Sequence, residues 1–278
     1  MKKITVLLAL LLSLLYFRTF TWLINAWLTD PYYSHGFLIP IISGFIAWMT
    51  IHKRKEESEF KPEPFKHGIF IFAFGLLLYA IGFIKLFPFV SAISFLFTLS
   101  GLILYFYGKP TMRSFLFPVS FLIFAIPLPL LVLEKVAYVL QTVSARHSAS
   151  IIELLGIPVT RTGAEIHLQD ASFIVGLPCS GMNSLLSLLA LATVFIYILR
   201  CPRYKKAVLL SATIPIAISA NVLRVTSLLL LANAYGADTA IGFFHTLFSP
   251  LLFIIAFILL ILVSIIIGCK VTAGGGGG

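Results

Sequence analysis

Long apolar runs separated by short polar segments dominate the chain, and they predict membrane-spanning helices. A helix needs about 20 mostly apolar residues to cross a bilayer, and eight runs approach that length. They cover residues 4–29, 37–51, 68–86, 89–108, 114–133, 180–199, 207–233 and 243–268. The first run is too long for a signal peptide, and no small-residue cleavage site follows it, so we interpret it as a helix. The pattern predicts an all-α polytopic membrane protein.

The segment 134–178, between the fifth and sixth runs, is too long for a simple turn. Its first half spaces apolar residues three and four apart, which predicts an amphipathic helix lying at the membrane interface. Gly156 and Pro158 end that helix. Two short alternating pieces, PVTRTGAEIHL and SFIVG, then predict a small β-hairpin that leads to Cys179. We expect a lid-like insertion, for which a purely structural role is the alternative.

The positions of lysine and arginine predict the orientation in the membrane. If the N-terminus is inside and the helices alternate, 14 of the 20 basic residues lie in inside segments. The positive-inside rule then places both termini in the cytoplasm and segment 134–178 outside the cell membrane. The charged segment 52–67 becomes a solvated cytoplasmic linker, to which we assign no chemistry.

Composition supports this assignment. The chain is 60% hydrophobic and only 11% charged, with a mean hydropathy of +1.06, whereas about a quarter of a soluble domain is charged. The net charge of +10 predicts no nucleic-acid partner, because most basic residues lie in the short loops. We expect a single membrane domain over residues 1–273, and the glycine run 274–278 is interpreted as a linker.

A cysteine at the head of the sixth run is the strongest chemical signal. In GLPCSGMNS, Cys179, Ser180 and Gly181 precede a long apolar helix. The first backbone amides of a helix have no intrahelical partner and carry partial positive charge, which favours a thiolate. Of the three cysteines, only Cys179 lies on the predicted outer side, so no disulfide framework is implied.

Arg224 lies inside the seventh run, eighteen residues after Lys206. That separation is roughly 27 Å along a helix, which places Arg224 near the outer face. A guanidinium within a spanning helix is costly unless it is paired or faces a cavity. It could simply reach to the interface. Because no carboxylate lies in that helix, we favour a fixed charge beside the thiolate and a developing oxyanion.

His245 opens the eighth run, also on the predicted outer side. An interfacial histidine is the simpler interpretation, but an imidazole beside a thiol and an arginine could transfer protons. Asn183 and Asn221 lie close in sequence to Cys179 and Arg224. Each could orient its neighbour or contact a substrate carbonyl, and a hydrogen bond between helices is the simpler interpretation.

A Cys/His metal site is conceivable on composition alone. His35, His167 and His245 could join Cys179, but no pair of them has a local ligand spacing such as CxxC or HxxxH. We therefore expect no metal and no cofactor.

These motifs together resemble the exosortase/archaeosortase family. The similarity rests on PCSGMNS at a helix head, NVLR in the next helix, a histidine opening the last helix, and the early loop DPYYSHGFLIP, and it covers about residues 20–260. Family members are multi-pass transpeptidases that are thought to cleave C-terminal sorting signals made of a short motif, a transmembrane helix and a basic cluster. One departure is Ser249-Pro250, because members often carry glycine four residues after the histidine.

The resemblance implies a role for each motif. Cys179 would be the nucleophile, Arg224 its electrostatic partner and His245 the general acid and base. The supporting or substrate-binding residues would be Tyr33, Ser34, His35, Ser180, Gly181, Asn183 and Asn221.

The implied partners are membrane-anchored proteins with C-terminal sorting signals, the lipid bilayer, and a polysaccharide or lipid acceptor at the cell surface. The chain would then be a multi-pass protein of the cytoplasmic (inner) membrane, with an extracytoplasmic active site. A transporter using Arg224 and His245, or a non-catalytic assembly factor for surface polymers, are the alternative functions. The sequence has no convincing internal repeat of the kind that many transporters carry.

Overall fold

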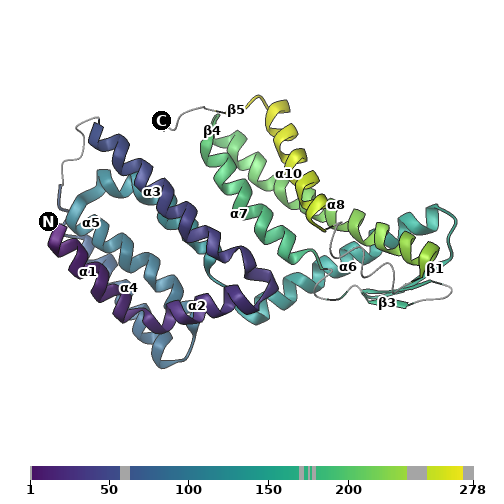
Figure 1. The fold of residues 1–278 in the computed structure, drawn as a ribbon, viewed down its shortest axis with the longest axis horizontal. Helices are drawn as coiled ribbons and strands as arrows, with labels where there is room; N and C mark the ends of the chain where they lie inside the picture. The colour runs from purple at the N-terminus through teal and green to yellow at the C-terminus, as the bar shows by residue number, and fades with distance from the viewer. Residues whose placement is uncertain are drawn as a thin grey trace. The chain divides into compact units, whose positions relative to one another are not determined.

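The structure is a computed structural model that describes residues 2–56, 63–168, 172–174, 176, 180–236 and 249–271. Helices make up most of these residues, and two small sheets accompany them, so the prediction of an all-α fold is confirmed. Contacts divide the chain into two compact units, residues 1–129 and 130–278, which are described separately (Figure 1). The single membrane domain over residues 1–273 stays a prediction.

The N-terminal unit contains α1 to α5 and two short 3₁₀ helices. Run 4–29 forms two helices, one on either side of Tyr16, and the angle between them is 69°. Runs 89–108 and 114–133 both contribute to α5, whose backbone is not helical at Gly108 (φ +80°), the residue at which the first of these runs was predicted to end. Pro127 and Pro129 disfavour helix in the residues before them, so run 114–133 ends earlier than predicted. The elements are α1 Lys2–Leu15, α2 Phe17–Thr29, η1 Pro31–Phe37, α3 Leu38–Glu56, α4 Gly68–Ile84, α5 Pro88–Phe121 and η2 Leu122–Ala125.

Glycines spaced seven apart bring α4 and α5 into close contact. A Cβ atom at Gly68 would lie 2.6 Å from the backbone nitrogen of Tyr105, and one at Gly82 would lie 2.6 Å from Ser91 Oγ. Gly75 packs in the same way on Thr98. In a membrane, where apolar burial against lipid is weak, such small-residue contacts hold helices together through van der Waals packing.

The C-terminal unit contains α6, α7, α8 and α10 with two sheets. Segment 134–178 contains most of α6, which begins earlier than predicted at Leu130, and a three-stranded antiparallel sheet in the order β1-β2-β3. A helix followed by a hairpin is confirmed, with Thr162 opposite Glu165 across the β1–β2 turn. The position of the helix at the membrane interface stays a prediction. The elements are α6 Leu130–Leu154, β1 Val159–Thr162, β2 Glu165–Leu168, β3 Ser172–Ile174, α7 Met182–Ile198, β4 Leu199–Arg200, α8 Arg203–Tyr235, α10 Ser249–Ile266 and β5 Lys270–Val271.

Several helices carry the length and composition of membrane spans. Among the described residues, three are long and apolar enough to cross a membrane, or four if the bent α1–α2 pair counts as one span. They are Pro31–Arg54, Pro88–Ala125 and Arg203–Tyr235, while α4, α7 and α10 are apolar but shorter. Large exposed apolar side chains such as Leu14, Ile84 and Ile266 suit contact with lipid. The number of eight spans and the orientation stay predictions.

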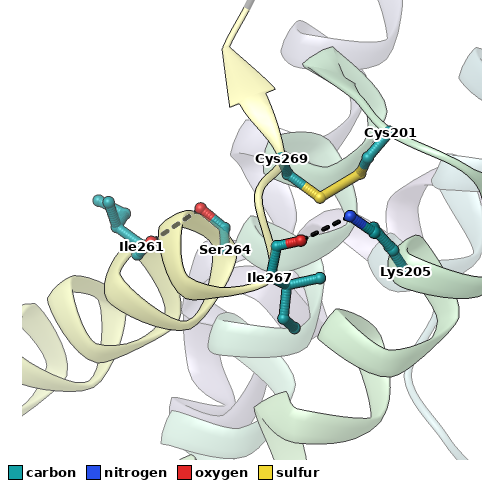
Figure 2. The surroundings of a disulfide bond; sticks show 6 residues. All are labelled: Cys201, Lys205, Ile261, Ser264, Ile267 and Cys269. Carbon is teal, nitrogen blue, oxygen red and sulfur yellow. Dashed lines mark hydrogen bonds between the residues drawn. A yellow bond between two sulfur atoms is a disulfide. The ribbon is translucent and has the colours of Figure 1, made fainter.

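A disulfide joins Cys201 to Cys269, which differs from the expectation of no disulfide framework (Figure 2). The two Cα atoms are 5.1 Å apart because β4 and β5 form a two-stranded antiparallel pair between the α7–α8 connection and the end of the chain. Lys205 Nζ donates a 2.7 Å hydrogen bond to the Ile267 carbonyl beside the bond. Residues far apart in sequence meet here, and no local spacing signals the pairing.

We expect the Cys201→Ser variant to unfold at a lower temperature than the wild type in oxidising buffer. The bond closes 68 residues of chain, and the chain-entropy model assigns about 4 kcal/mol to a loop of that length. A thermal unfolding curve in detergent, with and without reductant, measures the difference. Cys179→Ser is the matched control, which should keep the wild-type midpoint. Equal midpoints for Cys201→Ser and the wild type in oxidising buffer would contradict the expectation.

Candidate active site

The GLPCSGMNS motif leads into α7, which begins at Met182, directly after Gly181. Ser180 is 1% exposed, and its Oγ accepts a 3.2 Å hydrogen bond from the Met182 backbone nitrogen. Gly181 has φ +78°, a left-handed conformation that other residues rarely adopt. Cys179 itself lies outside the described residues, so the structure places only the two residues that follow it.

Gly181 packs directly against Asn221 of α8. A Cβ atom at Gly181 would lie 2.6 Å from Asn221 Cγ and 2.9 Å from Asn221 Nδ2. No side chain fits in that space, so the residue must be glycine for steric as well as backbone reasons. The CSG motif and the NVLR motif, forty residues apart in the sequence, are therefore in contact.

Asn221 also ties α8 to α6. It is 5% exposed, and its Nδ2 donates a 2.8 Å hydrogen bond to Ser144 Oγ. One turn further along α6, Ser148 Oγ donates a 3.1 Å hydrogen bond to the Val222 carbonyl. These bonds between helices agree with the simpler interpretation of Asn221, and they fix its side chain where it meets Gly181.

Arg224 follows Asn221 by one turn of α8 and lines a small pocket with it. Ser184 of α7 and Phe253 of α10 line the same pocket, so residues of three helices surround it together with Arg224. Figure 1 shows α7, α8 and α10 lying together in the C-terminal unit. Helix α8 is unbroken from Arg203 to Tyr235. The estimate of roughly 27 Å between Lys206 and Arg224 assumed a continuous helix, and this condition is met. Within the described ranges, the Arg224 side chain forms no ion pair.

The sheet of segment 134–178 is anchored on α8. Val225 and Leu229 of α8 form a buried cluster with Ile166 and Leu168 of β2 and with Ile152 of α6. Val225 directly follows Arg224 in the sequence, so the helix that carries the arginine also holds the sheet. This packing gives the predicted lid a fixed attachment to α8.

The remaining predicted site residues differ in how far the structure tests them. His245 lies outside the described residues, and α10 begins four residues later at Ser249. The departure Ser249-Pro250 falls in the first turn of α10, where proline is well tolerated because its missing N–H is not needed. Asn183 is exposed on α7, and its Oδ1 accepts a 3.4 Å hydrogen bond from Ser187.

Tyr33, Ser34 and His35 lie in η1 of the N-terminal unit. Tyr33 is 2% exposed, and its hydroxyl accepts a 2.9 Å hydrogen bond from the Leu128 backbone nitrogen. Ser34 is exposed, His35 is half-buried, and Gly36 packs on the Trp27 ring. The loop is thus a packed element of its unit, and its part in the active site stays a prediction.

Two residues of the site were missed by sequence reasoning. Ser184 lines the pocket and Ser144 binds Asn221. Ser184 lies three residues after Gly181, which places both on one helix face, so periodicity could have identified it. No sequence signal pointed to Ser144. In the part of the chain that the structure describes, no three His, Cys, Asp or Glu side chains gather where they could hold a metal.

Comparison with known proteins provides the family. The family model described as Transmembrane exosortase (Exosortase_EpsH) matches residues 27–262. No curated protein matches the chain, and no solved structure matches it. The matched range covers well over half of the chain and includes the Gly181–Asn221 contact and Arg224. The chain therefore belongs to the transmembrane exosortase family and is a multi-pass membrane protein.

Proposed function

We propose that this protein is a membrane-embedded cysteine transpeptidase that cleaves C-terminal sorting signals and transfers the new C-terminus to a surface acceptor. The observation that carries the proposal is the packing of Gly181 on Asn221, one turn from Arg224. It brings the residues after Cys179 to the arginine helix. A thiol nucleophile and a fixed cation near one another suit acyl transfer.

The first half of the reaction would form a thioester. The Cys179 thiolate attacks the carbonyl carbon of the scissile peptide, and the carbonyl oxygen becomes an oxyanion. Arg224 stabilises that oxyanion by charge and by its planar donors. The Met182 amide already bonds Ser180 Oγ, and we assign the Gly181 amide as a second oxyanion donor. His245 protonates the leaving amine, and the peptide C–N bond breaks.

In the second half, water or an acceptor amine or hydroxyl attacks the thioester. His245, now neutral, takes the proton of the attacking group, and the Cys179 thiolate leaves. The helix of the sorting signal would enter from the bilayer, with its basic end remaining on the cytoplasmic side. The sheet β1–β3, which is held on α8 through Val225 and Leu229, would limit the access of water to the thioester.

Replacing Cys179 by alanine should abolish processing, with a loss of at least about 1,000-fold, because the nucleophile is removed. The measurement is a gel shift of a co-expressed substrate ending in a transmembrane helix and a basic cluster. The matched control is Cys201→Ser with Cys269→Ser, which leaves Cys179 as the only cysteine and should still form a hydroxylamine-sensitive adduct. If Cys179→Ala processes the substrate like the wild type, the proposed function is wrong.

The Arg224→Lys variant should lose roughly 100-fold in turnover, as expected when an oxyanion donor is lost. Lysine keeps the charge but lacks the planar fork of the guanidinium. Arg203→Lys, at the other end of α8 and exposed, is the control that should retain wild-type turnover. Single-turnover rates in detergent distinguish slower chemistry from weaker binding. Wild-type rates for Arg224→Lys would rule out the oxyanion role.

Gly181→Ala should strongly impair processing, because alanine meets Asn221 and is also strained at φ +78°. Gly163→Ala is a close control: Gly163 has φ +65°, but nothing lies within 4 Å of an added Cβ. The control should cost only the backbone strain, about 1–2 kcal/mol. Processing rates are compared at equal amounts of folded protein. Similar rates for the two variants would show that the Gly181–Asn221 contact does not matter for activity.

A further inference from the structure

A second cavity lies in the N-terminal unit, where the start of α2 meets the α4–α5 turn. Arg18, Thr19 and Trp22 of α2 line it, together with Phe83 and Ser91 from either side of the turn. Its volume is about 150 Å³, several times what a single water molecule needs. None of the residues assigned to the acyl-transfer site contributes to it.

The cavity carries an unneutralised positive charge. The guanidinium carbon of Arg18 lies 5.1 Å from the centroid of the Phe83 ring, and no carboxylate lines the cavity. Within the described part of the chain, the guanidinium donates no hydrogen bond to protein. Arginine brings five N–H donors in a planar fork, so the wall of the cavity offers donors and charge to a ligand rich in acceptor oxygens.

Two buried hydroxyl groups complete the donor set. Thr19 and Ser91 are each 5% exposed and line the cavity. In the described ranges, neither hydroxyl makes a hydrogen bond to a protein atom, and neither is among the fully enclosed polar atoms that lack a partner. Each therefore keeps some surface open to an occupant. Ser91 Oγ lies close to Gly82, where an added Cβ would come within 2.6 Å of it. Both hydroxyls can therefore donate to an occupant of the cavity.

The depth of the cavity points to the lipid headgroup region. Tyr79 of α4 donates a hydrogen bond to the Leu15 carbonyl at the end of α1. Tyr79 comes thirteen residues after Lys66, and Leu15 comes thirteen residues after Lys2. Thirteen residues of helix span roughly 20 Å, and the residues that line the cavity follow Leu15 and Tyr79 in the chain. Such a distance approaches the thickness of the hydrocarbon core, and tryptophans such as Trp22 are common at that boundary.

The surroundings suit the chains of a lipid. Ile84, Leu86 and Phe87, which flank the cavity in the α4–α5 turn, are 74%, 66% and 60% exposed. An acyl chain packed over them would cover apolar surface at the place where the phosphate enters the cavity. A free anion would leave those side chains uncovered.

We propose that this cavity binds the phosphate group of an anionic phospholipid, in the leaflet away from Lys2 and Lys66. The Arg18 guanidinium donates to two phosphate oxygens, and the hydroxyls of Thr19 and Ser91 donate to the others or to the ester oxygens. Arg18 is the charged side chain of the cavity lining and no carboxylate lines the cavity, so its charge favours an anionic ligand.

The test measures thermal unfolding of the full-length protein in detergent with three separate additions. These are phosphatidylglycerol, diacylglycerol with the same acyl chains, and inorganic phosphate. Phosphatidylglycerol should raise the unfolding midpoint, and the other two should leave it unchanged. If diacylglycerol stabilises the protein equally, the phosphate is not recognised and the proposal is wrong. If inorganic phosphate does so, the ligand is a free anion and the lipid assignment is overturned.

Variants locate the effect. Arg18→Gln and Ser91→Ala should each need roughly tenfold more phosphatidylglycerol for half-maximal stabilisation, because a charge-assisted hydrogen bond is lost. Arg113→Gln removes an exposed positive charge elsewhere in the same unit and should behave like the wild type. Ser91→Ala keeps the proposal testable if Arg18→Gln does not fold. Wild-type lipid dependence in both Ser91→Ala and Thr19→Val would overturn it.

Discussion

The contact between Gly181 and Asn221 sets the geometry of the C-terminal unit. The absence of a side chain at Gly181 lets the head of α7 reach the side chain of a residue on α8. Asn221 is in turn held by Ser144 of α6. Three helices thereby have their relative positions defined at one point, and Arg224 follows one turn later. A bulkier residue at Gly181 would separate the residues after Cys179 from the arginine on which the proposed chemistry depends.

Close packing through glycine also holds the helices of the N-terminal unit together. Helices in lipid gain little from apolar burial against one another, so close approach through small residues and hydrogen bonds must hold them together. Gly68, Gly75 and Gly82 allow α5 to pack on the backbone of α4, and the buried Tyr16 hydroxyl is within hydrogen-bonding distance of Ser94 and Thr98. Each unit also places one arginine at a pocket wall, Arg18 or Arg224. A charged side chain within a membrane segment is costly, and it usually faces a cavity or a binding partner.

The disulfide between Cys201 and Cys269 bears on the orientation. The distribution of lysine and arginine predicts that both cysteines lie on the cytoplasmic side, where thiols are ordinarily kept reduced. The bond therefore represents the oxidised form of a pair that β4 and β5 hold together. The strand pairing and the Lys205–Ile267 hydrogen bond join the same two segments, so the sulfur bridge is not their only connection.

Hydrophobic periodicity by itself determined the helical class, most helix positions, and the helix and hairpin of segment 134–178, because these features follow from local spacing along the chain. It also located α7 directly after the CSG motif. It missed the 69° bend at Tyr16, whose hydroxyl meets Ser94 and Thr98 of α5, whereas the predicted end of run 89–108 coincides with the break in helical backbone at Gly108. The roles of Cys179, Arg224 and His245 were inferred from residue types and stay predictions.

Tertiary structure alone decided which polar residues meet. The distance between Gly181 and Asn221, the bond from Asn221 to Ser144, and the pairing of Cys201 with Cys269 all join positions dozens of residues apart. Asn183 and Asn221 looked equivalent in the sequence, yet Asn183 is exposed on α7 and Asn221 is buried between three helices. The physical reason is that local periodicity assigns a residue to a helix face, whereas the partner of that face depends on how the helices pack.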